Sequence, residues 1–150
     1  MDICEFLRKP SSYILVLELK KDFIGRIRSL GIIKLGKGRY LYIGSAKRGA
    51  ITRLKRYCYK QISKPYWHID YLVLNAEVIG AYVITYIDEE ALAQHIAKFL
   101  RPSIRRFGAT DTRDITHLFE YDEKRLLEAL RCLNYIYVDC DEISKCLGSH

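Results

Sequence analysis

Long apolar runs alternate with charged or glycine-containing segments in the first half of the chain. Residues 12–19 form a nearly continuous apolar run after a Pro-Ser pair, which predicts a central β-strand covered on both faces. Residues 32–35 predict a short strand, and residues 39–44 predict a second long strand that ends at Gly44. We expect the two long strands to pair as an antiparallel hairpin with a long, basic connection.

After Gly44 the apolar residues recur at every third or fourth position. Residues 49–62 therefore predict a helix. Its apolar face consists of Ile51, Leu54, Cys58 and Ile62. Residues 66–74 fit either a short helix or a strand, and we expect a helix because a clear strand, 76–86, follows almost at once.

The second half of the chain contains a helix with a strong start signal. Asp88 is a favourable N-cap for a helix over residues 89–100. Glu89 extends the apolar face of this helix and so needs a partner, whereas Glu90 faces water. The buried stripe is expected to comprise Leu92, Ala93, Ile96, Ala97 and Leu100. The later elements are a loop at 103–115, a strand at 116–121, a helix at 122–133, an edge strand at 135–138, and a short helix with a tail at 139–150.

Together these elements predict one α+β domain in which a small central antiparallel sheet is flanked by helices. Its core would span about residues 11–121, with a C-terminal helical extension over residues 122–150. The apolar runs are too short to cross a bilayer, and the N-terminus lacks the apolar core of a signal peptide. We therefore expect a cytoplasmic protein without a membrane partner; its oligomeric state is left open.

Positive charge is concentrated in the first half of the chain. The net charge is +7, yet residues 1–75 contain 16 Lys and Arg against 5 Asp and Glu, and the second half is acidic. Concentrated basic charge is typical of proteins that bind nucleic acids or other polyanions. A solvated surface would give the same counts, and the acidic half leaves open a protein-interaction domain.

Five cysteines are scattered along the chain without a Cys-x-x-Cys motif. Their odd number argues against a disulfide framework, and their spacing matches no zinc site. We therefore expect most of them to be free thiols, with one internal disulfide as the alternative.

Tyrosines, one arginine and one glutamate are the residues that could carry chemistry. The chain has no P-loop, no G-x-G-x-x-G and no His-Glu-x-x-His. Instead it has an ordered set: Tyr13-Ile14, Tyr42-Ile43-Gly44, Arg53 with Tyr57 four residues later, and Glu89 opening a later helix. This set resembles the GIY-YIG nuclease superfamily. Further stretches around Trp67 and His117 resemble a small, mostly archaeal branch of it, and the resemblance covers roughly residues 11–121. Ser12 and Ser45 depart from the usual pattern.

The resemblance implies an endonuclease that hydrolyses phosphodiester bonds in DNA with a single Mg²⁺ or Mn²⁺. Tyr13 and Tyr42 would be the active-site phenols, one of which positions or helps to deprotonate the attacking water. Arg53, with Tyr57 beside it, would stabilise charge on the phosphate, and Glu89 would hold the metal. His68 is a further catalytic candidate. The side chains expected to follow the backbone phosphates are Lys47, Arg48, Lys55, Arg56 and Lys60.

Each of these residues also has a purely structural interpretation. Tyrosine is common in strands, and an acid in the first turn of a helix favours the helix dipole. The alternative function is a non-catalytic nucleic-acid-binding module of the same fold. In either case, a protein partner is one means by which the domain could be directed to its nucleic acid.

Overall fold

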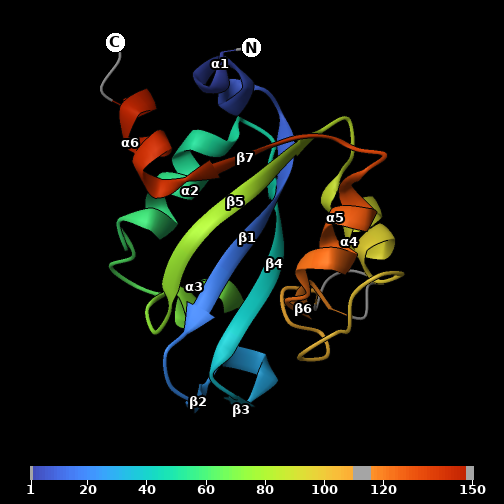
Figure 1. Ribbon diagram of the computed structural model, residues 1–150. Helices are drawn as coiled ribbons and strands as arrows, with labels where there is room; N and C mark the ends of the chain where they lie inside the picture. The colour runs from blue at the N-terminus through green and yellow to red at the C-terminus, as the bar shows by residue number, and fades with distance from the viewer. Residues whose placement is uncertain (1, 110–115, 148–150) are drawn as a thin grey trace.

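A computed structural model of the chain describes residues 2–109 and 116–147. Its centre is a five-stranded antiparallel sheet with the strand order β6-β4-β1-β5-β7. The strands are β1 (Ser11–Leu19), β4 (Gly38–Ala46), β5 (Glu77–Thr85), β6 (Leu118–Glu120) and β7 (Asn134–Asp139). Helices flank this sheet (Figure 1), so the predicted α+β class with a small antiparallel sheet is confirmed.

The strand β1 lies in the middle of the sheet, as its apolar run predicts. It pairs along its whole length with β4 on one side, and with β5 on the other. The connection between β1 and β4 contains β2 (Phe23–Arg26), a 3₁₀-helix, η1 (Arg28–Leu30), and β3 (Ile32–Leu35). The strands β2 and β3 form a separate two-stranded sheet. The sequence does not predict β2, because it has only four residues and includes a glycine.

Successive residues of β1 point to opposite faces and build two apolar layers. Tyr13, Leu15 and Leu17 belong to the layer beneath α2 (Ala50–Cys58), α3 (His68–Val73) and α6 (Cys140–Leu147). Ile14 and Val16 belong to the layer beneath α4 (Glu89–Ile96) and α5 (Glu123–Leu130). Figure 1 shows α2 and α4 on opposite sides of the sheet. The tyrosines of the ordered set therefore share the face that α2 covers.

Three predicted helices are shorter in the structure. The predicted helix 122–133 is α5, which ends at Leu130. The predicted helix 49–62 ends at Cys58, and the positive φ of 52° at Lys60 is incompatible with its continuation. The predicted helix 89–100 ends at Ile96, after which the chain forms a turn, and Ala97 is exposed rather than buried. The ambiguous segment 66–74 does contain a helix, α3.

The C-terminal part of the chain belongs to the fold. It is not only helical, because it supplies β7 as an edge strand of the main sheet. Its last helix, α6, is joined by the disulfide Cys4–Cys146 to α1 (Ile3–Arg8) and lies near both chain ends (Figure 1). A second disulfide, Cys58–Cys140, joins α2 to α6.

The expectation that most cysteines are free thiols is therefore wrong. Four of the five form disulfides, and Cys132 is the free one. The two pairs are separated by 142 and 82 residues, so local spacing could not reveal them. Positions 110–115 of the predicted loop and 148–150 of the predicted tail lie outside the described residues. Within residues 2–109 and 116–147, no helix is long and apolar enough to cross a membrane.

Candidate functional site

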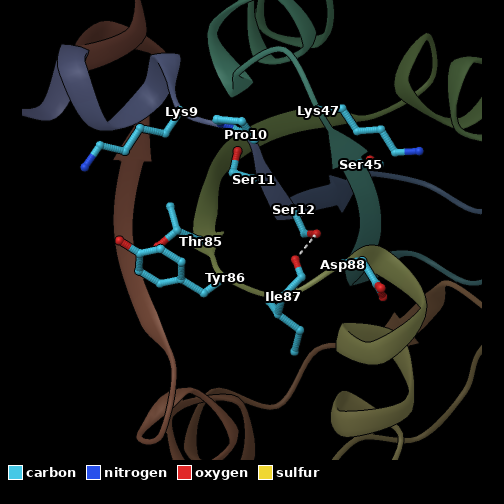
Figure 2. A pocket seen from close by; sticks show the side chains of 10 residues that line it. All are labelled: Lys9, Pro10, Ser11, Ser12, Ser45, Lys47, Thr85, Tyr86, Ile87 and Asp88. Atoms are coloured by element: carbon cyan, nitrogen blue, oxygen red, sulfur yellow. Dashed lines mark hydrogen bonds between the residues drawn. The ribbon is translucent and has the colours of Figure 1, made fainter.

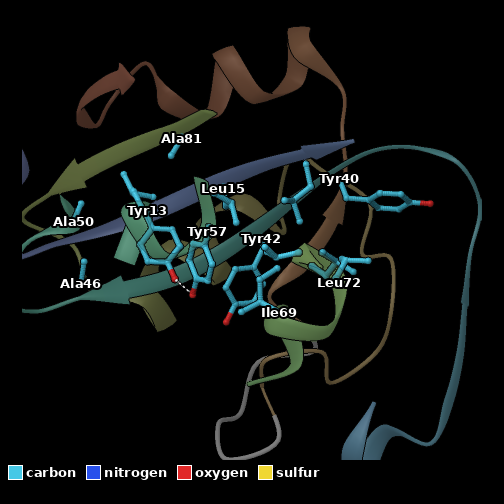
Figure 3. Close-up of a cluster of buried hydrophobic side chains, with 14 of the residues drawn as sticks. Tyr13, Leu15, Tyr40, Tyr42, Ala46, Ala50, Tyr57, Ile69, Leu72 and Ala81 are labelled. Carbon is cyan, nitrogen blue, oxygen red and sulfur yellow. Dashed lines mark hydrogen bonds between the residues drawn. The ribbon is translucent and has the colours of Figure 1, made fainter. Parts of the chain in front are cut away.

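Three tyrosines from three elements meet on the α2 face of the sheet. Tyr13 of β1 and Tyr42 of β4 lie diagonally across the strand pair, with ring centroids 6.4 Å apart. Tyr57 of α2 covers them, and its hydroxyl oxygen lies 3.0 Å from that of Tyr13. Figure 3 shows the three phenols pointing toward the same region below the sheet. Three of the predicted site residues are thus brought together.

Gly44 makes room for this arrangement. It lies directly opposite Tyr13 in the β1–β4 pair, and the Tyr13 ring passes over its backbone. A Cβ atom added at Gly44 would lie 2.2 Å from the Tyr13 hydroxyl oxygen and 2.3 Å from its Cζ atom. The glycine of the Tyr-Ile-Gly motif is therefore required by the close approach of the first tyrosine.

A second glycine performs a similar task for Tyr42. Gly108 has a φ of +68°, and a Cβ atom there would lie 2.9 Å from the Tyr42 ring. Its backbone N–H donates a 2.8 Å hydrogen bond to Nδ1 of His68. His68, proposed from the sequence as a catalytic residue, therefore holds the loop that packs on Tyr42. It also contacts Phe107, which packs edge-on against Tyr42.

Burial keeps the two strand tyrosines in their neutral form. Tyr13 is 2% exposed and Tyr42 is 7% exposed. Removal from water raises the pKa of both phenols well above the ordinary value, and neighbouring Tyr57 raises each further. Arg53 acts in the opposite direction and lowers the pKa of both. Each phenol can therefore donate a hydrogen bond at neutral pH.

Arg53 lies at the edge of the tyrosine cluster. Its guanidinium carbon is 4.1 Å from the centroid of the Trp67 ring, which holds the arginine over an aromatic face. Arg53 and Trp67 both line a groove of about 870 Å³ that runs along the start of α2. Lys47, Arg48 and Lys55 line the same groove, so three of the predicted phosphate-binding residues and Arg53 lie together.

Two other predicted phosphate-binding residues have structural roles. Arg56 also lines the groove, but its guanidinium forms an ion pair of 2.8 Å with the fully buried carboxylate of Asp70. The ammonium group of Lys60 donates hydrogen bonds to the carbonyl oxygens of Val73 and Ala76, and burial lowers its pKa. The structure therefore does not place Lys60 in the groove.

Glu89 approaches the cluster from the first turn of α4. It is the more buried of the two adjacent acids, as predicted, with its side chain 35% exposed while Glu90 is exposed. Its Oε2 atom lies 3.7 Å from Nδ1 of the buried His117. After burial and Tyr57, Glu89 is the next contributor that raises the pKa of Tyr42, so it lies within electrostatic range of the phenol.

Ser12 connects β1 to the start of α4. Its hydroxyl donates a 2.8 Å hydrogen bond to the carbonyl oxygen of Ile87, two residues before Glu89 (Figure 2). Ser12 lines a cavity of about 470 Å³ together with Ser45 and Lys47. Ser12 and Ser45, the two residues that differ from the sequence pattern named above, therefore both lie beside the start of α4.

Glu89 is the residue of the candidate site whose carboxylate could hold a divalent metal ion. Within the described ranges, no group of three or more His, Cys, Asp or Glu side chains could hold a metal. Mg²⁺ often takes one or two carboxylates and completes its shell with water and substrate phosphate. The partly exposed carboxylate of Glu89, with the His117 ring beside it, matches this open kind of site better than a closed cage.

The sequence did not predict the supporting contacts of four further residues, although the stretches around Trp67 and His117 had been singled out by the resemblance. Trp67, Asp70, Gly108 and His117 hold Arg53, Arg56, Tyr42 and Glu89 in place. The Asp70 contacts could not be read from one-dimensional spacing, because Arg56 lies 14 residues away. The contact of Trp67 with Arg53 could not be read in the same way, because the two residues lie 14 positions apart.

The fold and the site define an α+β protein with buried tyrosines beside a basic groove. The family model described as "Domain of unknown function DUF123" matches residues 12–137, which is most of the chain. The chain therefore belongs to the DUF123 family, and the match runs from β1 into β7. Searches of curated proteins and of solved structures gave no significant match.

Proposed function

We propose that this protein is a metal-dependent endonuclease that hydrolyses phosphodiester bonds in DNA. The observation that carries the proposal is the meeting of Tyr13, Tyr42 and Tyr57, with Arg53 and Glu89 within electrostatic range of Tyr42. These residues come from four separate elements and are far apart in the sequence. A basic groove beside the cluster supports nucleic acid as the substrate.

The groove residues suggest how a phosphate would be held. Lys47, Arg48 and Lys55 would contact backbone phosphates without reading the bases. The planar guanidinium of Arg53 would donate hydrogen bonds to the oxygens of the scissile phosphate. Negative charge on these oxygens grows during attack, so Arg53 would stabilise the transition state more than the ground state.

The phenols would orient the attacking water. A neutral Tyr42 can donate to or accept from this water, and its raised pKa makes it a poor base at neutral pH. As the water oxygen forms its bond to phosphorus, it would lose a proton to solvent; the bond to one sugar oxygen would break, and that oxygen would take up a proton from solvent. A divalent metal held by Glu89 would neutralise charge on the phosphate.

Cleavage of a supercoiled plasmid and of branched and single-stranded DNA, with Mg²⁺ or Mn²⁺, tests the proposal. Glu89→Gln and Arg53→Ala should each lower the rate by about 100-fold or more. Glu90→Gln is the matched control for the acid, because Glu90 is the exposed neighbour in the same turn. Arg131→Ala, at the exposed end of α5, is the control for the arginine.

Two results would overturn the proposal. Equal cleavage by the wild type and the two site variants would mean that the activity resides elsewhere. Salt-dependent DNA binding without any metal-dependent cleavage would support a non-catalytic nucleic-acid-binding module instead.

A further inference from the structure

Two aromatic side chains are held at the surface beside the candidate site. Tyr66 is 62% exposed and Trp67 is 40% exposed, although the residues that follow them in α3 are buried. Their rings meet edge to face, with centroids 5.5 Å apart and an interplanar angle of 89°. Large aromatic rings exposed side by side are unfavourable in water, which marks the pair as a candidate contact surface.

The backbone of this pair is fixed from below. The buried carboxylate of Asp70 accepts hydrogen bonds from the backbone N–H groups of Tyr66 and Trp67, at 2.9 and 3.0 Å. The same carboxylate pairs with Arg56 of α2. One buried group therefore ties the two exposed rings to the helix that carries Arg53. Such a rigid support lowers the entropic cost of binding.

Arginines accompany both rings. The guanidinium carbon of Arg28 lies 4.8 Å from the centroid of Tyr66, and its Nη1 donates a 2.7 Å hydrogen bond to the Tyr66 carbonyl oxygen. Arg53 and Arg56 lie 4.1 and 5.3 Å from the centroid of Trp67. Alternating aromatic rings and guanidinium groups are the side chains on which nucleobases stack.

Trp67 connects the basic groove to the tyrosine cluster. It lines the groove that contains Lys47 and Arg53. It also lines a neighbouring cavity of about 590 Å³, together with Tyr42, His68 and Tyr66. A cavity of this size lies within the usual range for ligand sites, ~300–1,000 Å³. A strand that follows the groove would thus pass the aromatic pair before it reaches Tyr42.

We propose that Tyr66 and Trp67 form a stacking platform for unpaired bases next to the scissile phosphate, in which each ring takes one base because the two rings are perpendicular. Both faces of a base are covered within a duplex, so a ring can stack only on a base that is single-stranded or extruded. The inference rests on the proposed function and narrows its substrate: the DNA carries at least one unpaired nucleotide beside the cleaved bond. The arginines would attract the phosphate groups of the DNA, and the two aromatic rings would stack on its unpaired bases.

The single tryptophan provides a direct measurement. The protein is titrated in EDTA, where no metal-dependent cleavage occurs, with an oligothymidylate of about 12 nucleotides. The comparison ligands are an abasic oligonucleotide and a blunt duplex of the same length. We expect the oligothymidylate to quench the Trp67 fluorescence, whereas the abasic strand and the duplex bind through the groove and leave it nearly unchanged.

Binding of labelled oligothymidylate to variants tests the second ring. Tyr66→Ala should weaken binding by about 5- to 150-fold, the range that corresponds to the loss of one base–aromatic stack. Tyr66→Phe should retain wild-type affinity, because it keeps the ring. Tyr135→Ala removes an exposed tyrosine from the edge strand β7 and is the control that should change nothing.

Equal affinity and equal quenching for the thymidine and abasic strands would overturn the platform. The same conclusion would follow if Tyr66→Ala and Tyr135→Ala bound alike. Because these measurements need no catalysis, they separate the two proposals. Metal-dependent cleavage without base-dependent quenching would refute only the platform. Base-dependent quenching without cleavage would refute the nuclease and leave the two rings as a base-stacking surface of a nucleic-acid-binding module.

Discussion

The contact between Gly44 and Tyr13 makes the strongest prediction about stability. Gly44→Ala would place a Cβ atom 2.2 Å from the Tyr13 hydroxyl oxygen, 2.3 Å from Cζ and 2.9 Å from Cε1. The Tyr13 ring cannot move away easily, because the residue is 2% exposed and its hydroxyl group is hydrogen-bonded to that of Tyr57. The substitution must therefore displace a buried side chain or the backbone of β4.

The expected cost follows from these contacts. Overpacking a well-packed core costs about 1–3 kcal/mol, and loss of the Tyr13–Tyr57 hydrogen bond adds about 1 kcal/mol. The lower entropy of an unfolded chain with alanine offsets about 0.4–1 kcal/mol. We expect a net loss of about 2 kcal/mol, which lowers Tm by about 4–8 °C in a domain of this size.

Urea denaturation followed by circular dichroism, under non-reducing conditions, measures the loss. Gly36→Ala is the matched control, because a Cβ atom at Gly36 has nothing within 4 Å. The decisive comparison uses a Tyr13→Leu background, which lacks the ring atoms that the new Cβ atom would meet. There Gly44→Ala should be close to neutral, giving a coupling energy of about 2 kcal/mol. An equal cost in both backgrounds would refute the steric argument.

Three further predictions concern stability and the assembly of the site. Ser12→Ala should cost about 1–2 kcal/mol, because it removes the 2.8 Å donor of the partly buried Ile87 carbonyl. Ser11→Ala should be neutral, since the Ser11 hydroxyl has no partner among the described residues, and equal urea midpoints of the two variants would contradict this. Because burial raises the folded-state pKa of Tyr42, the folded form retains a proton that the unfolded chain loses, and stability should fall above about pH 10 by ~1.4 kcal/mol per pH unit from this group. Tyr42→Phe in a Cys132→Ser background should flatten the fall, and an unchanged pH profile would refute the assignment. Replacing the disulfide that joins α2 to α6 by two serines should cost up to about 4.5 kcal/mol, because it closes a loop of 82 residues; a thermal midpoint equal to wild type would contradict the prediction.

The parts of the fold that depend on neighbouring residues could be predicted from the sequence. The pairing of β1 with β4 follows from two long apolar runs, and α3 follows from the short distance to the next strand. Arg53 and Tyr57 lie four residues apart on α2, so their closeness follows from helix geometry. The inward direction of Glu89 relative to Glu90 likewise follows from one turn of α4.

The parts that depend on distant residues could not be predicted. The disulfides join positions that meet only after α6 has packed on α1 and α2, and the sequence carries no local signal for this meeting. The Ser12–Ile87 hydrogen bond spans 75 residues. One missed element did have a signal. Asp2 caps α1, and Glu5 follows it three residues later, which is the usual spacing of a capping box.

The basic residues in and just after α2 show why counting positive charges overstates a binding surface. Arg56 and Lys60 contribute to the positive first half of the chain, yet one pairs with buried Asp70 and the other bonds to two carbonyl oxygens. Removing either partner of the buried pair would leave a charge without compensation, so Arg56 serves mainly to fix α2 against α3. The disulfide at Cys58 fixes the same helix on its other side. A helix of only nine residues is thereby held rigid. Arg53 can then remain both over the Trp67 ring and beside the phenols, because two of its basic neighbours hold the helix in place.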